Sequence, residues 1–303
     1  MVKHARAYAP GHITGFVEFP YVRFSDYLHM GSRGAGVCID KGVTTDVWVD
    51  GSSANKVSVQ INGNYVKNAD VSLYVVNEYL HSLVNPVYIK VNHKTDIPIG
   101  YGLGSSGAAA LSLSYALNEA LGLGLSKEEA ARIAHKADIA CKCGAGTVIA
   151  EYYGGFELRL SAGAPGIGVV KSIPLHGYKV VALCMNPYLT KEFLTSKMNL
   201  INGLGGKMLN KLLKSLSVND FMDMSLTFVK SIDLINAHTA RIIDELIDHG
   251  YKASVALFGD TVFSIVKEED VKDVTSILCK YRRGDDSRLL VCNVDNIGAR
   301  VIV

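Results

Sequence analysis

The sequence predicts an α+β fold with two domains, and three observations support that prediction. The chain of 303 residues is about two average domains long. Strand-like segments dominate the first hundred residues, and helical segments follow a glycine-rich loop. Such segregation is typical of α+β folds and not of an alternating, doubly wound sheet. A second glycine-rich stretch over 144–170 places the expected boundary near residue 165, between domains 1–165 and 166–303.

The first domain is expected to begin with strands and to continue with two helices. β-Branched, partly alternating segments predict strands at 43–49, 56–61 and 87–91. Asn62-Gly63 predicts a hairpin turn, because both residues tolerate positive φ. Apolar residues predict a helix over 108–121. Ser126 and Glu129 form a capping-box pattern, which predicts the start of a second helix over 127–141.

The second domain is expected to mix strands and helices. Strand patterns cover 167–173, 178–185, 253–258, 261–266, 289–294 and 299–303. Helical patterns cover 197–217, 219–249 and 268–280.

Composition excludes several classes of protein. The chain is 49% hydrophobic and 20% charged, whereas a disordered chain requires low hydrophobicity and high net charge. A formal charge of +2 provides no strong field toward nucleic acid or an anionic membrane. The six cysteines lack metal-ligand spacing, and the N-terminal segment lacks the apolar core of a signal peptide. We therefore expect a cytoplasmic enzyme with reduced thiols that binds neither nucleic acid nor membrane.

One uncharged segment is long enough to span a bilayer. It covers 97–118, between Asp96 and Glu119. Its first half contains Pro98 and four glycines, so only its second half can form a regular helix. A glycine-rich loop that leads into a buried helix is the better interpretation.

The loop Gly102-Leu-Gly-Ser-Ser-Gly107 is a candidate phosphate site. Glycines allow close approach to a ligand, and the helix N-terminus that follows offers free N–H groups. An ordinary glycine-rich turn is the alternative. A Walker A loop is excluded because Ala108 stands where lysine is required. A dinucleotide fingerprint is excluded because the acidic residues about 20 positions later begin a helix.

Three segments resemble the GHMP small-molecule kinases, a family that includes galacto-, homoserine and mevalonate kinases. IPIGYGLGSSGAAA at 97–110 resembles their phosphate loop, AYAPGHITGF at 7–16 their first motif and ASVALFGDTVFSIV at 253–266 their third. The third motif is reduced to Phe258-Gly259-Asp260-Thr261. The resemblance implies a ribosomal-protein-S5-like N-terminal domain, a ferredoxin-like C-terminal domain, and an ATP site in the cleft between them. Homodimers are common in this family, although nothing in these residues requires one.

Four further segments resemble the archaeal pantoate-kinase group within that family. They lie at 10–16, 30–39, 134–146 and 154–159, and His12 stands where mevalonate-type members have lysine. This resemblance implies phosphorylation of the terminal hydroxyl of (R)-pantoate to 4-phosphopantoate, in archaeal coenzyme A biosynthesis. Two alternatives stay open. One is a kinase for another hydroxy acid of the homoserine, shikimate or mevalonate type, and the other is a catalytically impaired nucleotide-binding regulator.

The resemblance also implies roles for residues around the loop. The nucleotide phosphates would be held by Gly102, Leu103, Gly104, Ser105, Ser106 and Gly107. Ser106 would bind Mg²⁺ through its hydroxyl, together with Asp138, at a position where the family usually has glutamate. Taken from the residues alone, Ser106 is an N-cap and Asp138 is a solvated carboxylate on a helix face.

Thr147 is a departure from the family that bears on catalysis. Relatives have an aspartate in a GLGDV segment, where this chain has Gly144-Ala-Gly-Thr147-Val148. A threonine cannot act as a general base at neutral pH, although its hydroxyl can accept a hydrogen bond. A metaphosphate-like transition state needs little deprotonation of the attacking hydroxyl. We therefore expect an active kinase in which Thr147 occupies this catalytic position without acting as a base.

Substrate binding is the last role that the resemblance implies. It falls on Ser32, Arg33, His135, Arg159 and Thr190. Arginine binds a carboxylate with a planar pair of N–H groups, so Arg159 is the expected clamp for the carboxylate of pantoate. Taken from the residues alone, Arg33 is a surface charge, Thr190 a strand-end cap and His135 a packed, hydrogen-bonded histidine.

Overall fold

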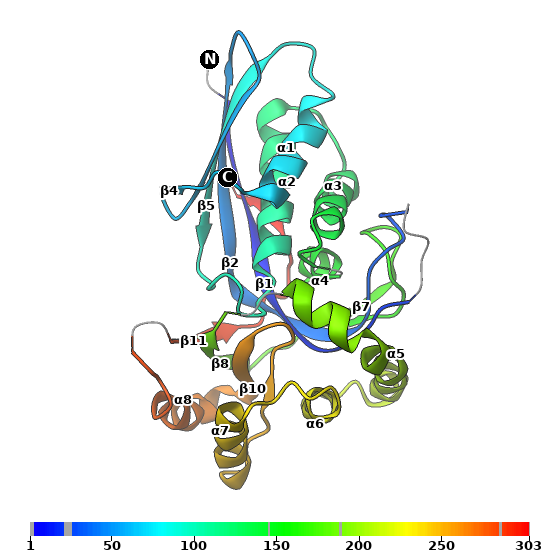
Figure 1. Cartoon of the computed structure of the whole chain (residues 1–303), viewed down its shortest axis with the longest axis vertical. Coiled ribbons are helices and arrows are strands. Elements are labelled where there is room, and N and C mark those ends of the chain that lie inside the picture. Colours follow the sequence, from blue (N-terminus) through cyan, green and yellow to red (C-terminus); the bar gives the residue numbers. More distant parts are fainter. Residues whose placement is uncertain (1–2, 21–25, 145, 188–189, 285–286, 303) are drawn as a thin grey trace.

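Two β-sheets and the helices around them form the molecule (Figure 1). The computed structural model describes residues 3–20, 26–144, 146–187, 190–284 and 287–302, with only the backbone described over 190–200. A long first sheet carries helices on one face, and a smaller second sheet lies near its lower end in the view of Figure 1. This arrangement confirms the predicted α+β class.

The first sheet is built around one long antiparallel pair. Its strands in the described chain are β1 (Lys3–Glu18), β2 (Arg33–Gly51), β3 (Lys56–Ile61), β4 (Asn64–Tyr65), β5 (Val87–Thr95), β6 (Phe156–Arg159), β7 (Val170–Ile173) and β12 (Arg300–Ile302). The main order is β12-β1-β2-β5-β3-β4, and β6 joins β2 on one side and β7 on the other. Two register shifts interrupt the β1–β2 pair, at Pro10/Gly11 and at Thr14/Phe16. The predicted hairpin at Asn62-Gly63 is confirmed by the pairing of β3 with β4.

Helices cover one face of this sheet (Figure 1). They are α1 (Asp70–Leu80), which the sequence patterns miss, α2 (Ser105–Leu121), α3 (Lys127–Ala140) and α4 (Thr147–Tyr153). The predicted start of α2 at residue 108 is wrong, because Gly104 turns the chain with a φ of 74° and the helix begins directly after it. The predicted capping box is confirmed, since Ser126 Oγ accepts a hydrogen bond from the Glu129 N–H. Among the described helices, none has the length and apolar character that a membrane crossing requires.

The second sheet has the strand order β11-β8-β10-β9. Its strands are β8 (Tyr178–Asn186), β9 (Ser254–Val255), β10 (Asp260–Lys267) and β11 (Arg288–Asn293). The helices in this half are α5 (Thr190–Ser215), α6 (Val218–Ser231), α7 (Ala237–Asp248) and α8 (Val271–Cys279), with a short 3₁₀ turn, η1 (Glu268–Asp270), before α8.

Two predictions for this half are wrong. The single helix expected over 219–249 is two helices, because Asp233 takes a φ of 55° and Asn236 then caps α7. The Asn236 side chain accepts hydrogen bonds from two N–H groups of the first turn of α7, which starts a new helix. The strand expected over 253–258 is confined to Ser254–Val255, since the chain turns away at 256–259 toward the first sheet.

One hydrophobic cluster joins the two sheets. Phe221 of α6 contacts Phe16 of β1 and Phe156 of β6, with ring centroids 6.0 and 5.2 Å apart, and all three rings are buried. The same cluster includes Val180 of β8 and Phe263 of β10. The domain boundary at residue 165 stays a prediction. It does not coincide with the change of sheet, because β7 and β12 follow it in sequence and still belong to the first sheet.

Phe221→Ala is expected to lower the free energy of unfolding by about 3–5 kcal/mol, because it removes the ring that contacts both strands and leaves a cavity. Chemical denaturation measures this change. Val84→Ala is the control, since Val84 is 97% exposed and its loss is expected to change stability by less than about 0.5 kcal/mol. A loss for Phe221→Ala as small as that of the control would contradict the joint core.

Candidate active site

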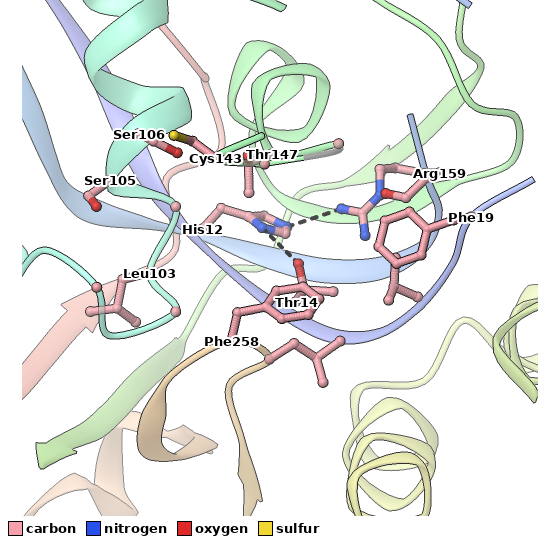
Figure 2. A pocket seen from close by; sticks show the side chains of 18 residues that line it. His12, Thr14, Phe19, Leu103, Ser105, Ser106, Cys143, Thr147, Arg159 and Phe258 are labelled. Carbon is pink, nitrogen blue, oxygen red and sulfur yellow. Dashed lines mark hydrogen bonds between the residues drawn. The ribbon is translucent and has the colours of Figure 1, made fainter. Parts of the chain in front are cut away.

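A cleft lies where the phosphate loop, β1 and the turn between β9 and β10 meet. Its lining comes from both sheets: His12 and Thr14 from β1, Arg159 from β6, and Leu257 and Phe258 from the turn (Figure 2). The Gly102–Gly107 loop forms one wall. This position agrees with the cleft between two halves that the sequence predicts.

The loop backbone is shaped by two left-handed glycines. Gly102 has a φ of 76° and Gly104 a φ of 74°, conformations that side chains rarely adopt. Because Gly104 is the N-cap of α2, the N–H groups of Ser105, Ser106 and Gly107 lie at the open helix end, where they lack intrahelical partners. Such an end binds anions, phosphate above all.

Hydrogen bonds attach this loop to both sheets. The His12 N–H donates to the Leu103 carbonyl at 3.0 Å, which ties the loop to β1. The Thr261 hydroxyl donates to the Tyr101 carbonyl at 2.8 Å, which ties it to β10. The loop is therefore fixed between two strands before any ligand binds.

The reduced third motif provides the close approach that this arrangement needs. A Cβ on Gly102 would lie 2.6 Å from the Leu257 carbonyl oxygen, and one on Gly259 would lie 2.0 Å from the Tyr101 carbonyl. The two glycines let the turn and the loop touch backbone to backbone. Phe258, the large residue beside Gly259, points into the cleft and so does not interfere with this contact (Figure 2). The turn therefore does not need a longer run of small residues.

Three oxygen-bearing side chains meet at the helix end. Ser106 Oγ donates to Asp138 Oδ1 at 2.9 Å, and Thr147 Oγ1 donates to Asp138 Oδ2 at 3.3 Å. Asp138 is 1% exposed, so it is not a solvated surface carboxylate. Burial raises the pKa of Asp138 to about 6, and the two hydrogen bonds oppose the shift. Two hydroxyls and one carboxylate are the hard oxygen donors that Mg²⁺ prefers when phosphate and water complete its shell.

Glu151 is a second buried carboxyl group next to the loop. Neither of its oxygens has a partner among the described residues. They face the loop backbone, because a Cβ on Gly104 or Gly107 would lie 2.5 or 2.7 Å from one of them. Burial first, and the charge of Asp138 second, raise the pKa of Glu151 well above its ordinary value. An uncharged group here does not repel an anion on the other side of the loop.

Arg159 lines the cleft and has one side-chain nitrogen without a partner among the described residues. Its Nη1 donates to Glu157 Oε1 at 2.6 Å, whereas Nε is buried without a partner among the described residues. A Cβ on Gly146 would lie 3.5 Å from this Nε and 2.2 Å from Ser32 Oγ. Arg159 and Ser32 thus flank one small space, which glycine at position 146 leaves open.

Of the other predicted substrate residues, Arg33 and His135 lie outside the cleft lining. Arg33 donates to Glu18 Oε1 at 3.0 Å and to the Leu160 carbonyl at 2.9 Å. His135 is buried, and its Nε2 lies 3.1 and 3.0 Å from the carbonyl oxygens of residues 27 and 30, next to the segment that leads to Ser32. Burial lowers the pKa of His135 to about 4, so it is neutral near pH 7. Thr190 begins α5, and its side chain lies outside the described residues.

The sequence analysis gave no site role to four groups that lie here: His12, Thr14, Glu151 and Glu157. Spacing was the available signal. His12 and Thr14, like Glu157 and Arg159, are two residues apart in a strand and therefore point to the same face. The sequence patterns predict neither β1 nor β6, so the two-residue spacing could not be recognised as one face of a strand.

The fold and the loop define a small-molecule kinase, and comparisons with known proteins agree. A family model described as GHMP kinases N terminal domain matches residues 64–155. Pantoate kinase from Methanocaldococcus jannaschii is 35% identical over 289 residues, which are 95% of this chain and 99% of that protein. Pantoate kinase from Thermococcus kodakarensis is 32% identical over 278 residues, 90% of this chain and 91% of that protein. The chain belongs to the GHMP kinase family.

Solved structures agree with this assignment. A protein described as a phosphotransferase related to the CoA biosynthesis pathway has a TM-score of 0.88 and 28% identity, and the match covers 98% of each chain. Homoserine kinase from Cytophaga hutchinsonii has a TM-score of 0.72 at 17% identity, covering 99% of this chain and 98% of that one, which shows the shared fold.

Gly104→Ala is expected to weaken ATP binding by about 100-fold, because the new methyl group would strain a left-handed turn and strike Glu151. Calorimetric titration with Mg²⁺ and a non-hydrolysable ATP analogue measures the effect. Gly122→Ala is the matched control: Gly122 ends the same helix with a φ of 67°, and a Cβ there meets nothing within 4 Å. Equal losses of affinity in both variants would contradict a phosphate site at the loop.

Proposed function

We propose that this chain transfers the γ-phosphate of ATP to the terminal hydroxyl of (R)-pantoate, giving 4-phosphopantoate, a step of archaeal coenzyme A biosynthesis. The observation that carries the proposal is the Arg159 Nε beside Ser32, which has no partner among the described residues, next to a loop suited to phosphate. A carboxylate site and a phosphate site in one cleft fit a hydroxy-acid kinase. The pantoate kinases named above support the choice of acid.

The nucleotide is bound by the loop. The N–H groups at the start of α2 point at the phosphates, and the partial positive charge of the helix end adds to their attraction. Ser106 and Asp138 would hold Mg²⁺, whose charge would offset that of the phosphates during transfer. A solved structure with the same fold, described as a complex with MVAPP, AMPPCP and magnesium, supports this proposal.

The acid is oriented by Arg159 and Ser32. Glu157 occupies Nη1 of the guanidinium, so the edge that carries Nε is left for the carboxylate of pantoate. The Ser32 hydroxyl donates to the same carboxylate from the opposite side of the space kept open by Gly146. The carboxylate is thereby fixed at one end, and the terminal hydroxyl extends toward the loop.

Arg33 and His135 support this site indirectly. Arg33 ties β2 to Glu18 and to the strand end after β6, and His135 holds the segment before Ser32. Both are positioning residues in this proposal. The roles of Thr190 and Thr147 stay predictions, as do a homodimer and a cytoplasmic location. Thr147 contributes a hydroxyl that donates to Asp138 and is suited to orienting a ligand oxygen.

Other hydroxy acids fit less well. Mevalonate kinase from Pyrococcus furiosus matches only 29% of this chain, and homoserine kinase from Sulfurisphaera tokodaii matches 32%, whereas pantoate kinases match along most of it. A regulator without activity is disfavoured because Ser106 and Asp138 remain in contact at the loop.

A panel of acids tests the proposal. With ATP and Mg²⁺, pantoate is expected to release ADP with a kcat/KM at least about 100-fold above those of homoserine, shikimate and mevalonate. All four acids can bind Arg159 through a carboxylate, so the expected difference comes from how well each one then positions its hydroxyl at the phosphate loop. Coupled ADP detection provides the rates, and mass spectrometry identifies phosphopantoate. A preference for another acid would show that pantoate is not the substrate. Tight ATP binding without turnover of any acid would indicate a regulator.

Arg159→Ala is expected to raise the KM for pantoate by about 100-fold, since a charge-assisted hydrogen bond contributes about 1.5–3 kcal/mol. The KM for ATP is expected to stay within about threefold of the wild-type value, because the loop is untouched. Steady-state kinetics with each substrate varied in turn provide both numbers. Arg288→Ala on β11 is the control. A similar rise in both KM values would discredit the carboxylate clamp.

A further inference from the structure

His12 lies beside the phosphate loop, in a buried position that the surrounding backbone leaves open for its ring. Its side chain is buried, and the two register shifts of β1 lie on either side of it. Such bulges commonly re-aim side chains next to active sites. The ring fits because position 36 is glycine: a Cβ there would lie 2.4 Å from His12 Nε2. A Cβ on Gly104 would lie 3.2 Å from the His12 Cβ, so the His12 side chain begins directly beside the loop.

Glu157 determines which ring nitrogen carries the proton. His12 Nε2 lies 2.9 Å from Glu157 Oε1, an oxygen that also accepts from Arg159 Nη1 at 2.6 Å. An oxygen that faces an arginine belongs to an ionised carboxylate, which can only accept hydrogen bonds. Arg159 Nη1 also lies 3.5 Å from His12 Nε2, at the limit of a hydrogen bond and longer than the 2.9 Å contact to Glu157 (Figure 2). Because the shorter contact is to the carboxylate, we assign the proton to Nε2, and in the neutral ring Nδ1 is left as an acceptor. This is the arrangement in which a carboxylate orients an imidazole for proton transfer.

His12 Nδ1 is connected to the cleft by the hydroxyl of Thr14. Thr14 Oγ1 lies 3.3 Å from His12 Nδ1, a long contact, and Thr14 is partly exposed in the cleft wall (Figure 2). A threonine hydroxyl donates one proton and accepts others. It can therefore give its proton to Nδ1 while it accepts one from a substrate hydroxyl in the cleft.

Other groups near the loop are less suited to accept this proton. Thr147 is a hydroxyl, and both oxygens of Asp138 already accept hydrogen bonds at the expected cation site. Glu151 lies behind the loop, against Gly104 and Gly107.

We propose that His12, oriented by Glu157 and reached through the Thr14 hydroxyl, accepts the proton of the substrate hydroxyl during phosphoryl transfer, in place of the aspartate that this chain lacks at Thr147. The inference rests on the proposed function, since it assumes that a hydroxyl is phosphorylated in this cleft. It assigns to the chain a proton acceptor outside the segment where its relatives have aspartate.

The proton and electron movements balance. The substrate oxygen forms its bond to the γ-phosphorus as its proton moves to Thr14 Oγ1 and the threonine proton moves to His12 Nδ1. The bond between the γ-phosphorus and the bridging oxygen breaks, and ADP leaves with that electron pair. The imidazolium is stabilised by Glu157 and returns its proton to water after the product leaves.

The surroundings keep His12 ready to accept a proton. Burial lowers the pKa of His12 below its ordinary value, Glu157 opposes the shift and Arg159 adds to it. Cys38 of β2 is its register partner, and Glu151 of α4 lies beyond Gly104. The ring is thus neutral near pH 7, and protonation at lower pH would block its role.

His12→Gln tests the proposal through kcat at saturating Mg²⁺ and saturating acid. We expect kcat near pH 7 to fall by about 100-fold, the usual size of general-base catalysis, while the affinity for ATP stays within about threefold. The wild-type kcat is expected to decline in acid as His12 is protonated. Asp138, with a pKa of about 6, titrates in both proteins, so the variant should lose only the part of the decline that belongs to His12. Glu157→Gln removes an influence that raises the pKa of His12, so the acid decline should move to lower pH.

Thr14→Val and Thr14→Ser test the same path without changing the histidine. Valine removes the hydroxyl and is expected to lower kcat about as much as His12→Gln, whereas serine is expected to retain most of it. His93→Gln is the matched control. His93 is also buried, with Thr45 Oγ1 2.8 Å from its Nδ1 and Ser72 Oγ 2.9 Å from its Nε2, but it lies on β5 away from the cleft lining. Its variant should keep the wild-type pH profile.

A kcat within about threefold of wild type for His12→Gln or Thr14→Val would overturn the proposal, as would a lower kcat with an unchanged pH profile. The wild-type protein in the same assay tests the proposed function separately. If it turns over another acid of the panel instead of pantoate, the variants are compared on that acid, and the role of His12 stands or falls on those rates.

Discussion

The structure depends on a close contact between the phosphate loop and its neighbours, in which glycines leave no room for a side chain. The phosphate loop lies between β1 and the turn before β10, and Gly102, Gly104 and Gly259 have carbonyl, amide or carboxyl atoms where a Cβ would project. Hydrogen bonds from His12 N–H and Thr261 then hold the loop in this gap. The same contact that joins the two sheets therefore shapes the anion site, so the binding of phosphate and the packing of the halves cannot be separated.

Buried charge makes the cleft selective. Arg159 and Glu157 are almost fully buried, which costs free energy unless their hydrogen-bonding groups are satisfied. Glu157 Oε1 satisfies one corner of the guanidinium, but Arg159 Nε and Glu157 Oε2 lack partners among the described residues. A ligand carboxylate would satisfy the guanidinium, whereas a neutral ligand would leave it unpaired. Specificity for an acid then follows from the cost of an unmatched group rather than from the shape of the cavity alone.

Much of the fold could be predicted because its signals are local. The Ser126 capping box marks a helix start within four residues, and the hairpin at Asn62-Gly63 needs only two. The buried environment of Asp138 could not be predicted, since its helix face reads as polar until the phosphate loop packs against it. The pairing of His12 with Glu157 joins residues 145 positions apart. Only the tertiary structure brings these two residues together, so local sequence patterns cannot predict their contact.

Strand β12 pairs with β1, although nearly 300 residues separate them in the sequence. β12 pairs with β1 through residues 300–302 and lies at the edge of the first sheet, and the Ala299 N–H donates to the Glu151 carbonyl at 2.9 Å just before it. During synthesis on the ribosome, β1 emerges early, yet the outer side of this strand lacks its neighbour until residues near 300 have been made. The helix that places Glu151 behind the phosphate loop contacts the same segment, so the nucleotide site reaches its finished form only after residues near 300 have been made.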